Sequence, residues 1–295
     1  AGGDADPTDA IPTDGVLFLQ GGGDFALLTD SVSPLFASGA TIATGDAHLS
    51  PGRDTLVWSA GGELRLAATD GSLARTLTAA IDGAPLVATP RFSPDGNAVF
   101  LVAGQPGAGG FSEASMYRAQ LDMDTVVPTR VSASAATCAV FRAIALRGPS
   151  RVIAVRDVCD DPGDAGLFEV LTSTGTATPL MKNVPDAPGV VTATAISADR
   201  GTLYAWASGS FDTNGDLTAD VEATGIYAFE LGSGELTTYE PSIDGVVTAI
   251  AAGSGGVILG VQSENGDQNL VAVTLPSGSS GALTTTGDAR SPVTY

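Results

Sequence analysis

The segment DTNGDLTAD carries oxygen-bearing side chains at alternate positions. Its first, third, fifth and ninth residues have carboxylate or amide groups, and the backbone carbonyl of its seventh residue falls between the last two. A tightly wound loop can turn alternate oxygens toward one centre, and Ca²⁺ takes about six to eight hard oxygen ligands. The spacing therefore predicts a calcium loop. The expected ligands are Asp212, Asn214, Asp216, Thr218 through its carbonyl, and Asp220.

The same segment resembles the short calcium loops of the DxDxDGxxD type, which also occur between the second and third strands of propeller blades. Leu217 stands where the sharp turn usually has Gly, and Ala223 stands where an EF-hand has its bidentate Glu, which excludes a helix-loop-helix hand. Glu222 could add a ligand if its strand directs it back toward the loop. The resemblance implies a structural ion, for which a dissociation constant of about 0.1 to 1 mM would suffice outside the cell. The alternative is an Asp/Asn/Gly turn held by bonds between side chains and backbone.

The only two cysteines, Cys138 and Cys159, are predicted to form a disulfide. They flank the segment CAVFRAIALRGPSRVIAVRDVC, which has the pattern of a β-hairpin that turns at its central Gly-Pro pair. If Arg147 pairs with Ser150, the register places the cysteines directly opposite each other, with Cβ atoms about 4.5 to 5.5 Å apart. Such a disulfide would stabilise the fold by about 2 to 4 kcal/mol and indicates an oxidising compartment. Two buried free thiols are the alternative.

The elements that must position these residues follow an internal repeat. The segments AHLSPGRDTLVWSAGG, PRFSPDGNAVFLVAG and AISADRGTLYAWASG each have an apolar residue, a small polar residue, a turn and then a strand-like segment. AIALRGPSRVIAVRDV and AIAAGSGGVILGVQS are weaker copies. The successive separations of the repeated apolar residue are 43, 52, 52 and 54 residues, which is the period of propeller blades. These apolar residues are Leu49, Phe92, Ile144, Ile196 and Ile250.

At the element RFSPDG the chain resembles the TolB-type propeller repeats, which are related in architecture to WD-repeat proteins. The resemblance is clearest at residues 48–58 and 90–100, and it extends to 195–206. It implies an all-β, six-bladed β-propeller, with seven blades as the alternative if the N-terminal segment forms a unit of its own. Propellers serve as hydrolases, lyases, calcium sites and binding platforms, so the fold alone does not define an activity.

The two ends of the chain are predicted to complete one blade together. Residues 15–39 supply three strands without a preceding first strand, and the C-terminal segment ARSPVTY offers one. Val293 follows Ile250 by 43 residues, so the C-terminal strand is expected to close the first blade and leave no unpaired gap. We expect a flexible N-terminal tether at residues 1–14 and a single propeller domain at residues 15–295.

Two further acidic segments, CDDPGDAG and SENGDQN, are expected at the equivalent connection of the neighbouring blades. Connections between second and third strands emerge on one face of a propeller, so the three segments would form an acidic sector there. Such a sector attracts a basic partner or further cations. Ordinary solvated loops are the alternative. The residues concerned are Asp160, Asp161, Asp164, Glu264, Asn265 and Asp267.

Other catalytic chemistry has little support in the sequence. His48 is the only histidine and aligns with Arg91 of the next repeat, which argues against a Ser/His/Asp triad, Cys/His catalysis and a zinc site. His48, Arg91 and Arg142 are expected to line or approach the central channel, where they could hold a small anionic ligand. Structural bonds between blades are the alternative.

The charge of the chain narrows the classes of partner. A formal charge of -20, from 33 acidic and 13 basic residues, argues against nucleic acid and anionic membranes, which bind clustered Lys and Arg. No apolar run approaches the roughly 18 to 20 residues that span a bilayer, so no direct membrane insertion is expected. The polar opening AGGDADPTDAIPTDG resembles the tether of a processed secreted precursor, and a lipid-anchored parent is left open.

These observations predict a secreted, periplasmic or cell-surface propeller that acts as a non-catalytic binding or scaffold protein with a structural calcium. It would dock a protein or glycan partner, with a basic partner favoured by the charge. The alternative function is a calcium-dependent hydrolase or lyase acting on polysaccharide or phosphate ester. A third is a subunit of a larger extracellular assembly. Converging carboxylates with perturbed pKa values would favour the enzyme.

Overall fold

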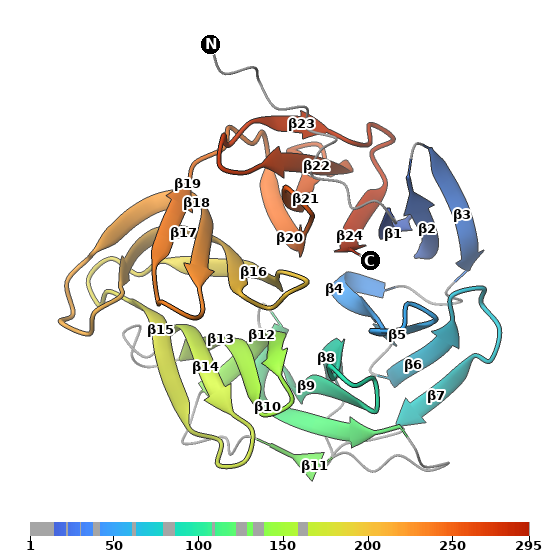
Figure 1. Cartoon of the computed structure of the whole chain (residues 1–295), viewed down its shortest axis with the longest axis horizontal. Coiled ribbons are helices and arrows are strands. Elements are labelled where there is room, and N and C mark those ends of the chain that lie inside the picture. Colours follow the sequence, from blue (N-terminus) through green and yellow to red (C-terminus); the bar gives the residue numbers. More distant parts are fainter. Residues whose placement is uncertain are drawn as a thin grey trace. The chain divides into compact units, whose positions relative to one another are not determined.

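The computed structural model describes most of the chain, and every element in the described residues is a β-strand (Figure 1). Within these residues no helix is long and apolar enough to cross a membrane. The predicted tether at residues 1–14 lies outside them. The described residues are 15–21, 23–29, 31–37, 42–60, 63–78, 86–107, 110–121, 129–131, 139–158 and 165–294.

The strands form antiparallel sheets in a propeller-like, all-β fold, as the repeat predicts. Four sheets have four strands each and the fifth has eight. The four-stranded sheets are, in spatial order, β24 (Ala289–Thr294), β1 (Val16–Gln20), β2 (Asp24–Leu28) and β3 (Val32–Ala37); β4 (Ile42–Leu49), β5 (Thr55–Ala60), β6 (Glu63–Ala68) and β7 (Arg75–Thr78); β8 (Leu86–Phe92), β9 (Ala98–Gly107), β10 (Gly110–Gln120) and β11 (Thr129–Arg130); and β20 (Val246–Ala252), β21 (Gly256–Gln262), β22 (Gln268–Thr274) and β23 (Ser280–Ala282).

The eight-stranded sheet contains two runs of four consecutive strands. They are β12 (Ala139–Gly148), β13 (Arg151–Val158), β14 (Gly166–Leu171) and β15 (Ala177–Asn183), then β16 (Val190–Ile196), β17 (Thr202–Asp212), β18 (Val221–Glu230) and β19 (Leu236–Tyr239). The two runs are joined where β15 pairs with β17 over two residue pairs. The second run contains the four strands expected from the sequence, and β17 and β18 extend beyond those expectations toward the predicted calcium loop.

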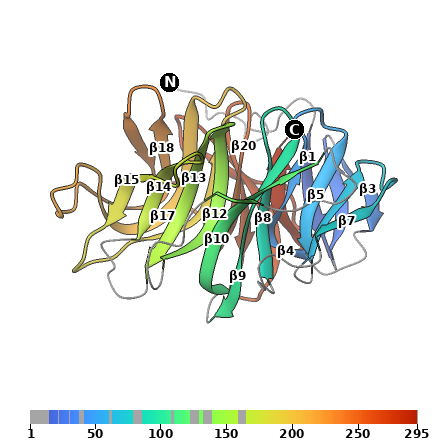
Figure 2. The ribbon, with the colours of Figure 1, turned by 90° about the horizontal axis from the view of Figure 1, so that it is seen from below.

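The chain forms two compact units. Unit 1 comprises residues 1–45, 192–207 and 224–295, and unit 2 comprises residues 46–191 and 208–223. In each unit, clusters of buried apolar side chains lie between consecutive sheets. The apolar face of each sheet is therefore buried against its neighbour, which is the main source of stability in such a fold. Figure 2 shows the strands of unit 2, including β8 to β10 and β12 to β14, in the side view.

One turn recurs between the first and second strands of three sheets and explains the repeated sequence element. Ser93 donates its backbone N–H to the Ala98 carbonyl (2.8 Å), and its hydroxyl accepts the N–H of Ala98 (2.9 Å) and donates to Asp95 Oδ1 (2.5 Å). Asp95 Oδ1 also accepts the N–H of Asn97 (3.1 Å). The Ser and Asp side chains thus satisfy turn groups that the β-ladder leaves unpaired. The other copies of the Ser–Asp pair are Ser50 with Asp54 and Ser197 with Asp199.

The same position of each turn has a left-handed backbone. Gly96 has φ +73°, and Arg53 and Arg200 each have φ +61°. Each of them lies three residues after the Ser of its turn. Gly adopts this conformation without strain, whereas Arg does so at a cost. The turn therefore keeps its geometry even where its sequence departs from the preferred residue.

The predicted closure of the first sheet by the C-terminal strand is confirmed. β24 pairs antiparallel with β1, with Leu17 opposite Val293 and Val16 opposite Thr294. Phe18 and Ala289 are buried in the same apolar cluster. The edge of β1 is thus paired by a strand from the other end of the chain, which removes an open sheet edge.

The hairpin of β12 and β13 departs from the predicted register at its turn. Gly148 pairs with Arg151, instead of Arg147 with Ser150. Two register shifts on β12 then restore the predicted pairing at the far end, where Ala139 lies opposite Val158. Each shift places an extra residue on β12, as in a β-bulge. Periodicity indicates which residues form strands but does not show such bulges.

Candidate functional site

The loop with the five predicted ligands lies in unit 2 and joins β17 to β18, the second and third strands of their run, as expected. At its base the backbone N–H of Asp220 donates to the carbonyl of Phe211 (3.0 Å), and the Phe211 side chain is fully buried. The β17 residues at the base pair with β15, where Asn183 lies opposite Phe211. The base of the loop is therefore held by the sheet, while residues 213–220 are exposed.

Asp212 organises the first half of this loop. Its side chain is buried, with a relative exposure of 2%. Oδ1 accepts the N–H groups of Asn214 (3.0 Å) and Gly215 (2.6 Å), and Oδ2 accepts that of Leu217 (2.9 Å). Burial raises the pKa of Asp212, but the hydrogen bonds from Gly215, Leu217 and Asn214 outweigh burial and hold the pKa below its usual value near 3.8. Both carboxylate oxygens thus accept hydrogen bonds from the loop backbone.

The remaining predicted ligands also bond within the loop. Asp220 Oδ2 accepts the N–H groups of Thr213 (2.8 Å) and Asn214 (3.1 Å), and Oδ1 accepts the Asn214 side-chain amide (2.9 Å). Asp216 Oδ1 accepts the hydroxyl of Thr218 (2.5 Å) and its N–H (2.8 Å). The Thr218 hydroxyl is the largest cause that lowers the pKa of Asp216. The side chains of the loop are therefore arranged as acceptors around its own donors.

Leu217 has the backbone conformation that its sequence position requires. Its φ is +68°, in the left-handed region that the Gly of the resembled loops would adopt easily, and its side chain is 56% exposed. Gly215 is also left-handed, with φ +89°. The departure from the sequence pattern therefore leaves the turn intact and adds strain at Leu217.

The donor atoms fit calcium in kind, since carboxylate, amide and carbonyl oxygens are its preferred ligands. Their observed arrangement is that of the hydrogen-bonded Asp/Asn turn that the sequence leaves as the alternative. Across the described parts of the chain, no group of three or more His, Cys, Asp or Glu side chains is placed to hold a metal ion. Glu222 is exposed on β18. The calcium site stays a prediction.

The predicted channel residues His48 and Arg91 are held by bonds within unit 2. His48 Nδ1 accepts the backbone N–H of Phe92 (3.2 Å), which links β4 to β8, and the two rings lie 6.2 Å apart. The guanidinium of Arg91 donates to the carbonyl of Pro90 (2.8 Å). The His48 bond is of the kind expected for a structural link between blades. Arg142 lies on β12 with its side chain outside the described part, and the channel ligand site stays a prediction.

Cys138 and Cys159 lie outside the described residues, so the disulfide also stays a prediction. Their chain neighbours Ala139 and Val158 are directly paired, which is the register that the prediction needs. Of the other acidic segments, the one with Glu264 joins β21 to β22 in unit 1, the expected connection, and its acidic and amide side chains are exposed. The segment at residues 159–164 is not described.

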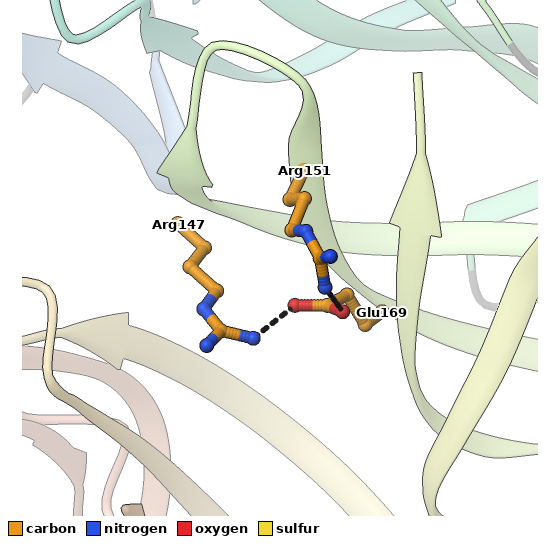
Figure 3. Close-up of polar contacts among 3 residues, drawn as sticks. All are labelled: Arg147, Arg151 and Glu169. Carbon is orange, nitrogen blue, oxygen red and sulfur yellow. Dashed lines mark hydrogen bonds and ion pairs between the residues drawn. The ribbon is translucent and has the colours of Figure 1, made fainter. Parts of the chain in front are cut away.

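One charged cluster was not predicted from the sequence. Glu169 on β14 accepts hydrogen bonds from Arg147 (2.6 Å) and Arg151 (2.5 Å), one through each carboxylate oxygen (Figure 3). The Glu169 side chain is 14% exposed and that of Arg151 is 51% exposed. The cluster ties together the three strands β12, β13 and β14. Its sequence signal is weak, because only the strand register brings Glu169 next to the two arginines.

Solved structures with a similar fold are numerous, although their sequences are distant. TolB from Acinetobacter baumannii aligns with 96% of this chain and 67% of its own length, with a TM-score of 0.65 and 14% identity. The propeller of a nidogen/laminin complex aligns with 95% of this chain and 97% of its own, with a TM-score of 0.66 and 10% identity. The fold is that of the TolB-type β-propellers. No protein-family model matches the chain, and no curated protein matches it in sequence.

Two enzymes share the TolB-like fold. A Mycobacterium tuberculosis puromycin-hydrolyzing peptidase aligns over 92% of this chain but only 44% of its own, with a TM-score of 0.63 and 16% identity. An oligogalacturonate lyase in complex with manganese aligns over 95% of this chain and 79% of its own, with a TM-score of 0.58 and 13% identity. At such identities the TolB-like similarity establishes the fold and leaves the activity open.

Proposed function

We propose that the chain is a non-catalytic binding propeller, located outside the cytoplasm, that docks a protein or glycan partner on its acidic turns. Its net charge of -20 favours a basic partner. The predicted disulfide supports an oxidising location. A calcium ion in the loop of residues 212–220 would have a structural role, since the loop is anchored on the sheet through the buried Phe211.

The observation that carries this proposal is the state of the turn carboxylates. Each Asp in the described residues whose pKa clearly departs from the usual value has it lowered. For five of the six the largest cause is a Ser or Thr hydroxyl bonded to the carboxylate, and for Asp212 the backbone bonds outweigh burial. A general acid at neutral pH needs a raised pKa, whereas a fixed negative charge attracts a basic surface. The six residues are Asp54, Asp70, Asp95, Asp199, Asp212 and Asp216.

The rival function is a calcium-dependent hydrolase or lyase acting on polysaccharide or phosphate ester. The peptidase and the lyase among the similar structures favour it, whereas the propeller of the nidogen/laminin complex favours a binding role. The binding role is preferred because the lowered pKa values keep the turn carboxylates ionised, and an ionised group has no proton to donate.

We propose six blades for the fold. The eight-stranded sheet would then be two blades, because its two runs of four strands meet only through Lys182 opposite Asp212 and Asn183 opposite Phe211. Such a bridge at the base of a long loop is a local extension of β17.

The test compares binding with turnover. Binding of an oligolysine peptide to the full chain is measured by calorimetry at about 0.05 M and about 0.5 M salt, since screening weakens surface attraction. The matched variant carries D70N, D199N and D216N, because Asn keeps an acceptor oxygen for each turn. We expect salt-dependent binding that the triple variant weakens severalfold. Equal binding by the variant contradicts the proposal.

The rival is tested on the same protein. Polygalacturonate and an aryl phosphate are incubated with the chain in calcium and in chelator. Turnover that requires calcium, and that scales with protein concentration, overturns the non-catalytic proposal.

A further inference from the structure

A cavity of about 380 Å³ opens in unit 2 between two of the recurring turns. One wall is the turn between β4 and β5, and the other is the turn between β8 and β9. The two walls stand close together, because a Cβ atom placed on Gly96 would lie 3.7 Å from the Cδ atom of Pro51. The turn hydrogen bonds described above fix both walls, so the cavity is formed before any ligand arrives.

Two carboxylates lie on the rim, each with one oxygen available. Asp54 Oδ1 accepts the hydroxyls of Ser50 (2.8 Å) and Thr55 (3.1 Å), and the same oxygen of Asp95 accepts the Ser93 hydroxyl. No hydrogen bond to Oδ2 of either Asp is found within the described residues. The hydroxyl donors lower the pKa of both carboxyl groups, so both are ionised at neutral pH. The rim thus presents two oriented acceptors with negative charge.

An arginine and an amide complete the rim. Arg75, the first residue of β7, is exposed and lines the cavity, and its guanidinium has no hydrogen bond or ion pair in the described structure. The side-chain amide of Asn97 likewise lines the cavity, while the backbone of Asn97 is bonded to Asp95 and Leu121. Unlike Arg147 and Arg151, which share Glu169, Arg75 therefore faces two carboxylates without pairing with either.

The floor of the cavity is apolar. Leu66 and Phe92 are each only 4% exposed and belong to one buried cluster, against which Leu121 packs. Phe92 is held from behind by the bond from its backbone N–H to His48. An apolar group that covered this floor would gain about 25 cal/mol for each Å² removed from water.

The rim and floor together select a class of ligand. A simple cation meets the charge of Arg75, a simple anion meets two carboxylates, and an uncharged apolar molecule desolvates the rim without pairing it. A molecule with an ammonium group, a carboxylate and an apolar body matches all three regions. We infer that this cavity binds a small apolar zwitterion, such as a dipeptide of apolar residues, with its ammonium at Asp54 and Asp95 and its carboxylate at Arg75. This inference does not rest on the proposed function.

The test titrates the full chain with three probes by calorimetry at low salt. They are leucyl-leucine, its N-acetyl form without the ammonium, and its C-terminal amide without the carboxylate. We expect the unblocked dipeptide to bind at least about tenfold more tightly than either blocked form, because each loses one charge pair. Equal binding of the three probes, or no binding of leucyl-leucine at about 10 mM, overturns the inference.

Variants assign the two charges. R75Q should abolish the preference for the unblocked dipeptide over the amide, and D95N should abolish its preference over the N-acetyl form. Both side chains are exposed and Asn keeps the Oδ1 acceptor, so the fold is retained. D199N is the matched control, because Asp199 makes the same turn bond to Ser197 but does not line the cavity. Full binding by R75Q and D95N, or an equal loss in D199N, overturns the inference.

Discussion

The Ser93 turn and the loop of residues 212–220 use aspartates in opposite ways. In the Ser93 turn, Asp95 commits one oxygen to the turn and leaves the other toward a cavity. In the long loop, Asp212 commits both oxygens to three backbone N–H groups. The difference indicates that acidic spacing alone does not define a ligand site. What matters is which oxygens remain after the turn has been built.

The two aspartates should therefore differ most in their effect on stability. D212A removes a buried acceptor and leaves the N–H groups of Asn214, Gly215 and Leu217 without their partner, which should cost about 2 to 3 kcal/mol. D95A, at an exposed position, should cost less. Urea unfolding of both variants measures the difference. A loss in D212A no larger than in D95A would break the comparison.

Acid should act on the same bonds to a smaller extent. The pKa of Asp212 is lowered in the folded state, so its stabilisation is full above the unfolded pKa near 3.8 and is lost as pH falls through the lower folded pKa. We expect the stability of the wild type to fall below about pH 4, and D212N to show a shallower decline. Unfolding midpoints measured from pH 6 to pH 2 check the slopes. Parallel slopes would remove Asp212 from the acid response.

The sequence indicated these two regions with unequal success. The repeat located the turns and the strands because each unit carries its own periodicity and turn residues. It could not show which aspartate oxygens the turns consume, since that depends on donors such as Ser93 and Thr218. It also missed the cavity with Arg75, because Arg75 and Asp95 come from different sheets. Likewise, the bulges of β12 shifted the turn of its hairpin without leaving a mark in the alternation of residues.

Calcium tests whether the long loop can still accept a ligand. If the loop binds calcium, the ion at about ten times its dissociation constant stabilises the fold by roughly 1.4 kcal/mol. For a chain of this size we expect a rise of about 2 to 4 °C in the thermal midpoint over the midpoint in chelator. Magnesium is the control, because it demands a tighter octahedral geometry. An unchanged midpoint leaves the loop as a hydrogen-bonded turn.

The smallest effects should come from the left-handed residues of the two regions. G96A introduces a Cβ at φ +73° in the Ser93 turn and should destabilise the chain by about 1 kcal/mol. L217G relieves the same strain at φ +68°, but Gly also gains freedom in the unfolded chain, so the net gain should be at most about 0.5 kcal/mol. Urea unfolding measures both, with G232A as a control because Gly232 does not have a positive φ and has open space around it. If L217G destabilises the chain, Leu217 contributes contacts that outweigh its strain, and the two turns differ in more than their aspartates.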